Sequence, residues 1–185
     1  MGRNFTAYLG HRLKETEIFE MEYHLNSGAL RSISDFIDLL LPYNSDEKQV
    51  VWKAYKDDVG GTVVLDGPCG ITLTFSKHVC RLGHYTRWIT FLLNDLEIDF
   101  RNSLRNICRE LSEYLKSTFA LYVPDSGAKE SAIMDFMWGD ENKPIEYMRE
   151  WLLDRCGPPA DNIEAIYKEF EDHIETDGYY IDEFV

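Results

Sequence analysis

A change of hydrophobic period in the middle of the chain most restricts what it can fold into. Residues 71–75 and 85–93 alternate in side-chain character with a period of two, which is typical of half-buried strands. Between 94 and 118 the apolar residues instead recur every three or four positions, at Phe100, Leu104, Ile107, Leu111 and Leu115. This spacing predicts an amphipathic helix at about 96–117. An extended apolar run at 119–123 follows, so we expect the helix to pack across one face of a mainly antiparallel sheet.

Helices are expected on both sides of this central stretch. The earlier residues predict a strand at 5–9, a helix at 15–25, a helix capped by Ser32 or Ser34, a helix at 45–55, a strand at 62–65 and a loop at 76–83. The later residues predict helices at 131–138, between Pro144 and Gly157, and from Asp161 onward. The pattern indicates one α+β domain over residues 1–185, with an acidic, mainly helical C-terminal third from about residue 125.

Negative charge is concentrated in that C-terminal third. The chain has 33 acidic and 19 basic residues, a formal net charge of -14. From Asp125 onward there are 17 acidic and 5 basic residues, a net charge of -12, which leaves -2 for residues 1–124. Such a field repels phosphate backbones and attracts basic proteins or cations. We therefore expect a basic protein partner and no nucleic acid; no pattern in the sequence indicates an oligomeric state.

The cysteines and the hydropathy favour a cytoplasmic protein. The four cysteines form no CxxC pair, and Cys108 falls on the apolar side of the predicted helix, where a thiol packs as a small hydrophobe. No signal peptide is visible, and the apolar run at 37–41 is short and contains Asp38. We therefore expect a reducing, cytoplasmic compartment and no membrane association.

The best metal candidates are Cys69, His78, Cys80 and His84, in or beside predicted hairpin loops. Thiolate and imidazole groups suit zinc, but this spacing matches no common zinc pattern, so we expect no metal and no cofactor. Convergence of these loops would support the alternative function of a small hydrolase or metal-dependent enzyme. The sequence has no Gly-x-Ser-x-Gly elbow and nothing marks a group that would orient a Cys/His pair, so no catalytic residue is predicted.

A nuclease interpretation depends on two short segments. Pro124-Asp125 and Glu141-x-Lys143 have the order and rough separation of the motif in metal-dependent PD-ExK nucleases. In that family the second half lies on a strand, whereas here it precedes Pro144 and is typical of a loop that leads into a helix. The negative field also has the wrong sign for DNA. We therefore expect no nuclease activity.

Aromatic rings and acidic side chains are mixed along the C-terminal third. Interfaces use rings for desolvated contact and charge for steering and partner choice. The predicted partner-binding residues are Trp138, Asp140, Glu141, Asp177, Tyr179 and Tyr180. The alternative is that the acids form a solubility coat and the rings belong to the core.

Three segments carry a resemblance to known proteins: Ala120-Leu-Tyr-Val-Pro-Asp-Ser126, Cys156-Gly-Pro-Pro159 and Ile163-x-x-Ile166-Tyr167. With these segments, its acidity and its lack of a catalytic motif, the chain resembles the immunity proteins of bacterial toxin–antitoxin and contact-competition systems. The likeness is one of type and assigns no role to any residue. It implies a non-enzymatic bacterial protein that inhibits a cognate toxin by stoichiometric binding, often by covering the active site of a basic enzyme.

Overall fold

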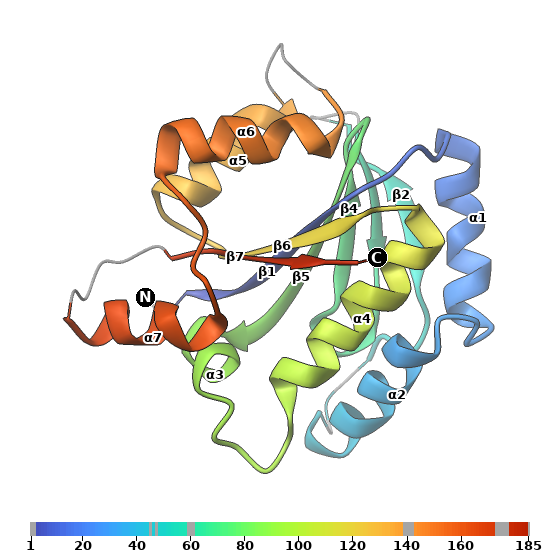
Figure 1. Ribbon diagram of the computed structural model, residues 1–185. Helices are drawn as coiled ribbons and strands as arrows, with labels where there is room; N and C mark the ends of the chain where they lie inside the picture. The colour runs from blue at the N-terminus through green and yellow to red at the C-terminus, as the bar shows by residue number, and fades with distance from the viewer. Residues whose placement is uncertain are drawn as a thin grey trace.

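A seven-stranded antiparallel sheet forms the centre of the computed structural model (Figure 1). The structure describes residues 3–44, 46, 48–58, 62–138, 143–172 and 178–184. The strands lie in the order β2-β3-β4-β5-β1-β6-β7, and every neighbouring pair is antiparallel. With helices before and after the central strands, this architecture confirms the predicted α+β fold class.

The strands are β1 (Asn4–Gly10), β2 (Lys53–Lys56), β3 (Val63–Asp66), β4 (Thr72–Phe75), β5 (Val79–Arg87), β6 (Phe119–Pro124) and β7 (Tyr180–Glu183). The helices are α1 (Glu15–Asn26), α2 (Arg31–Leu40), α3 (Trp88–Leu93), α4 (Phe100–Leu115), α5 (Ala128–Trp138), α6 (Ile145–Cys156) and α7 (Ile163–Asp172), with 3-10 turns η1 (Leu41–Tyr43) and η2 (Pro68–Gly70). In the part of the chain that the structure describes, no helix combines the length and the apolar character needed to cross a membrane.

The predicted central helix is α4, and its apolar stripe is buried. Leu104, Ile107, Leu111 and Leu115 share one cluster with the sheet residues Ala7 and Tyr122. Asp99 begins the helix, because its side chain accepts a hydrogen bond from the Asn102 N–H at 3.0 Å. The helix prediction is confirmed, and the helix is a few residues shorter at each end than predicted.

Strand side chains alternate between two apolar clusters, one on each face of the sheet. On β6, Ala120 and Tyr122 belong to the cluster that contains the α4 residues, whereas Leu121 and Val123 belong to a cluster with α5 and α6 residues such as Ile133 and Met148. Figure 1 shows α1, α2 and α4 on one side of the sheet and α5 and α6 on the other.

Three of the predicted element boundaries are wrong. Residues 53–55, expected in a helix over 45–55, instead lie in the edge strand β2, which pairs with β3. The expected strand at 85–93 divides into the end of β5 and the helix α3, in which Trp88, Phe91 and Leu92 are buried at helical spacing. The expected loop at 76–83 is mostly strand, because β5 already begins at Val79 in a tight hairpin with β4.

Side chains from other helices accept hydrogen bonds from backbone N–H groups of α2 and β2. The Glu110 carboxylate on α4 accepts hydrogen bonds from Arg31 N and Ser32 N at 2.8 and 2.7 Å, so it caps α2 in place of Ser32 or Ser34. Glu22 on α1 accepts from Ala54 N at 2.5 Å on the outer side of β2. The exposed edge at β2 is therefore partly covered by α1.

Candidate functional site

Acidic side chains of the C-terminal third form ion pairs within the chain. Arg105 on α4 donates from Nε and Nη2 to the two oxygens of Asp182 on β7, both at 2.7 Å. The Tyr122 hydroxyl donates to the same carboxylate at 2.9 Å. Arg101 on α4 pairs with Glu164 on α7, and Arg149 on α6 pairs with Glu183 on β7. These acidic side chains therefore attach α7 and β7 to α4 and α6.

The groups around Asp182 have shifted pKa values that keep them in one protonation state. Burial raises the pKa of Asp182, but the hydrogen bonds from Arg105 and Tyr122 outweigh it, so the pKa lies below its ordinary value. Burial raises the pKa of the Tyr122 hydroxyl and of the Cys108 thiol nearby. The Asp182 carboxylate and the Arg105 guanidinium stay charged, while Tyr122 and Cys108 stay neutral, which suits a structural link between α4 and β7.

The predicted partner-binding residues have different locations. Asp140, Glu141 and Asp177 lie outside the described residues, as does the side chain of Trp138 at the end of α5. Tyr179 is only 2% exposed, and its hydroxyl donates to the Gly157 carbonyl at 2.6 Å, with burial raising its pKa to about 12.

The two adjacent tyrosines therefore contribute little ring surface for a partner. The Tyr179 ring lies in the cluster between the sheet, α5 and α6, so its contact with a partner stays a prediction that this burial does not favour. Tyr180 is half-buried, and its ring stacks on Tyr122 with centroids 6.2 Å apart.

The four metal candidates do not gather into one site. His84 is buried; its Nε2 donates to the Cys69 carbonyl at 3.1 Å and its Nδ1 accepts from Thr86 N at 3.1 Å, so both ring nitrogens are occupied. Cys80 lies in the core beside Cys108, whereas His78 lies in the turn between β4 and β5. In the described segments, no three His, Cys, Asp or Glu side chains are placed to hold a metal ion.

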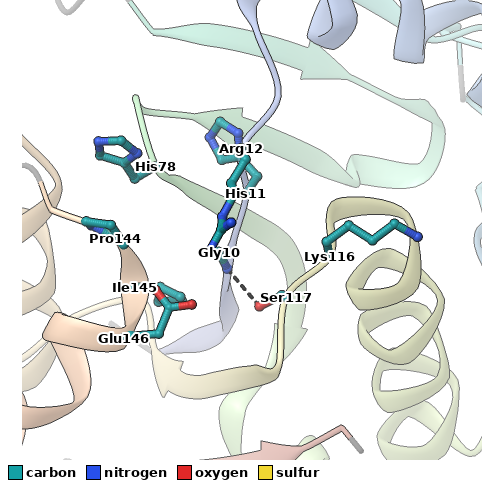
Figure 2. Close-up of a pocket in the computed structure, with 9 residues that line it drawn as sticks. All are labelled: Gly10, His11, Arg12, His78, Lys116, Ser117, Pro144, Ile145 and Glu146. Atoms are coloured by element: carbon teal, nitrogen blue, oxygen red, sulfur yellow. Dashed lines mark hydrogen bonds between the residues drawn. The ribbon is translucent and has the colours of Figure 1, made fainter.

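A pocket of about 210 Å³ opens where β1 ends (Figure 2). Four segments line it: 10–12, His78, 116–117 and 144–146. A side chain at Gly10 would not fit, because a Cβ there would lie 2.4 Å from Ile145 Cγ2. The Gly10 N–H donates to Ser117 Oγ at 2.9 Å, and that hydroxyl donates to the Phe119 carbonyl at 2.8 Å. The hydroxyl proton of Ser117 is thus already used within the fold.

Two of the ionisable side chains around this pocket, His11 and Lys116, point away from it. Gly10 faces Ile145, so the next side chain along the strand, His11, faces the opposite side of the sheet. There its ring packs edge-on against Phe75 at 5.2 Å, and its Nε2 bonds the Ser76 carbonyl at 2.8 Å. The Lys116 side chain extends away from the other lining residues in Figure 2. The described lining therefore offers no nucleophile paired with a base.

The clearest exposed feature is the outward face of α1. Ile18, Met21 and Leu25 bury its inward face, while Phe19 and Tyr23, one turn apart, are 38% and 76% exposed. The exposed Glu17 and Glu20 lie on the side of α1 nearest α4. The ring of His24, on the same side of α1, lies 5.9 Å from the ring of Tyr114 on α4, and burial, followed by the charges of the two glutamates, raises the pKa of Tyr114.

We call this set of residues the α1 surface: Glu17, Phe19, Glu20, Tyr23 and Tyr114. The sequence analysis placed the acidic and aromatic partner-binding residues in the C-terminal third and did not identify the α1 surface. The available signal was within α1 itself, where Phe19 and Tyr23 fall outside the inward stripe among four glutamates.

Comparison of the chain with protein-family models, with curated proteins and with solved structures gives no match. The proposed function therefore depends on the geometry of the chain itself.

Proposed function

We propose that this protein is a non-enzymatic binding protein that holds a basic partner protein, in the manner of an immunity protein that neutralises a toxin. The α1 surface is the observation that carries the proposal. Phe19 and Tyr23 are exposed although α1 already buries three other apolar side chains, so folding does not require these two rings to be apolar. Large rings beside acidic groups supply the anchoring and the steering that a protein interface needs.

The support of α1 favours a preformed interface. Glu22 accepts a hydrogen bond from Ala54 N, and Asn26 both donates to the Trp52 carbonyl at 3.1 Å and accepts from Trp52 N at 2.8 Å. These bonds attach the C-terminal half of α1 to the start of β2. A surface held in its binding conformation loses less conformational entropy on association, which favours tight binding.

The pocket at the end of β1 adds indirect support. Its Ser117 hydroxyl is engaged within the fold, and the His11 ring lies on the other face of the sheet. Such a pocket gives no specific reason to prefer an enzyme, so binding is the better-supported class.

The experiment measures association with a basic protein encoded beside the gene for this chain. The on-rate should fall as salt rises from 0.01 to 0.1 M, because the Debye length shrinks from about 30 Å to about 10 Å. Glu17→Lys and Glu20→Lys should slow association. Tyr23→Ala should speed dissociation by at least about tenfold, because a desolvated ring holds the complex once it has formed.

Matched controls use the same substitutions at other exposed positions. Tyr43→Ala removes a ring that is 71% exposed on η1, and Glu97→Lys reverses a charge before α4; both should leave the rates near those of the wild type. Circular dichroism of each variant verifies the fold. Equal effects of Tyr23→Ala and Tyr43→Ala, or an on-rate independent of salt, would place the interface away from the α1 surface.

A further inference from the structure

The strand β7 forms one edge of the sheet, and its pairing with β6 determines which of its backbone groups point outward. Phe184 N donates to the Thr118 carbonyl at 2.8 Å, directly beyond the pair formed by Glu183 and Phe119. Hydrogen-bonded pairs alternate along an antiparallel ladder. Tyr180 and Asp182 therefore bond to β6, while the N–H and C=O groups of Ile181 and Glu183 point away from the sheet.

The outer side of β7 is occupied only at its start. Ala160 N donates to the Tyr179 carbonyl at 2.8 Å, as a neighbouring strand would. Beyond that point, no described residue makes a backbone hydrogen bond to Ile181 or Glu183 on this side. The opposite edge of the sheet differs, because Glu22 covers the Ala54 N–H of β2 there. An uncovered edge is a template for a further strand.

Two hollows flank this open edge, one toward each face of the sheet. The hollow on the α6 side has a volume of about 350 Å³ and includes Leu153, Pro159 and Ala160. The hollow on the α4 side has a volume of about 650 Å³ and includes Arg109 and Glu113. Both reach Glu183, and side chains of a strand alternate between faces, so an added strand would place successive side chains in the two hollows.

We propose that the outer edge of β7 accepts an extended segment of the partner protein as an eighth strand of the sheet. An apolar side chain of that segment would lie in the α6-side hollow, where Leu153 is 52% exposed next to Ile181. The segment is basic overall, because the chain from Asp125 onward has 17 acidic against 5 basic residues. The same charge disfavours a second copy of this chain. The inference rests on the proposed function for the basic character of the partner, but it uses a different surface from α1.

The probe is an eight-residue peptide of alternating valine and lysine, titrated into ¹⁵N-labelled protein. Binding should shift the amide resonances of Ile181 and Glu183 and slow their hydrogen exchange. A bound edge strand uses the N–H groups of only one alternate set of its residues. N-methylation of one set should therefore weaken binding at least about tenfold, and N-methylation of the other set should not. A valine–glutamate peptide should bind more weakly than the valine–lysine peptide.

Variants separate this edge from other surfaces. Leu153→Arg should weaken peptide binding at least about tenfold, whereas Leu96→Arg, at a leucine that is 54% exposed before α4, should not. Tyr23→Ala on the α1 surface should leave peptide binding unchanged, so failure of the α1 proposal would be seen separately.

Four results would overturn the strand-addition proposal. One is the absence of shifts at Ile181 and Glu183 with the peptide at about 1 mM. Another is that both N-methylated peptides bind equally weakly, or that both bind as tightly as the unmethylated peptide. A third is a preference for the glutamate peptide. The last is a dimer that forms without peptide and that Leu153→Arg dissociates, which would place a second copy on the edge.

Discussion

At the scale of single residues, His84 shows how burial determines a protonation state. Nε2 faces a carbonyl oxygen and therefore carries the proton, while Nδ1 accepts from the Thr86 N–H. Burial lowers the pKa of the ring from 6.5 to about 4, and the hydrogen bond to the Cys69 carbonyl opposes this only in part. Burial likewise lowers the pKa of His11.

The free energy of unfolding should therefore fall as the pH falls from 6.5 to 4. In that window the unfolded chain binds a proton at residue 84 that the folded chain does not, so acid favours unfolding. The pKa difference corresponds to about 3 kcal/mol. Urea unfolding measures this free energy at each pH. Relative to its own value at pH 8, the free energy of unfolding of His84→Gln should fall in acid by about 3 kcal/mol less than that of the wild type. The same pH dependence of the unfolding free energy in both proteins would contradict the prediction, because it would mean that the folded chain accepts the proton on His84 as readily as the unfolded chain.

The candidate site was only partly predictable from single residues. The sequence shows that acidic and aromatic side chains are abundant, but it does not show which of them are used inside the fold. Tyr179 and Tyr180 are adjacent, and only the packing of the folded chain directs the first ring into the cluster with α5 and α6 residues. Asp182 likewise has its partners 77 and 60 residues away, at Arg105 and Tyr122.

At the scale of elements, α4 was predictable because its helical period is long and regular. We expect Leu111→Ala to lower the free energy of unfolding by about 2–5 kcal/mol, since the buried side chain would leave a cavity under the helix. The exposed Leu96→Ala is the matched control and should change it by less than about 0.5 kcal/mol. Chemical denaturation of both variants measures the difference, and similar values for the two would contradict the observed packing.

The shorter elements were less predictable because distant contacts determine them. Residues 88–93 are rich in strand-forming side chains, yet burial of Trp88, Phe91 and Leu92 on one side favours a helix there. The strand β2 has only four residues, and its pairing with β3 and its contacts with α1 decide its structure. The strand β7 depends on β6, about 60 residues earlier, and its own short pattern gives no clear strand signal.

At the scale of the whole molecule, charge has two opposite effects on the folded state: ion pairs stabilise it, and the net negative charge destabilises it. Ion pairs such as Arg105–Asp182, Arg101–Glu164 and Arg149–Glu183 attach the acidic C-terminal third to the fold. The remaining surplus gives a net charge of -14, which opposes the compact state by self-repulsion while it attracts a basic partner. Most of these ion pairs have at least one well-exposed partner, so each contributes little to stability.

We therefore expect salt to stabilise the isolated protein while it slows association with its partner. Raising NaCl from 0.01 to 0.1 M shortens the Debye length from about 30 Å to about 10 Å and screens the self-repulsion. A gain of 1 kcal/mol would raise the melting temperature by about 2–4 °C for a chain of this size. The double variant Glu17→Lys, Glu20→Lys changes the net charge by four units, from -14 to -10, and should melt with a smaller dependence on salt. Thermal melts of both proteins across the salt series measure the two slopes. A melting temperature that falls with added salt would mean that the ion pairs outweigh the repulsion, and the acidic surplus would then be chiefly structural.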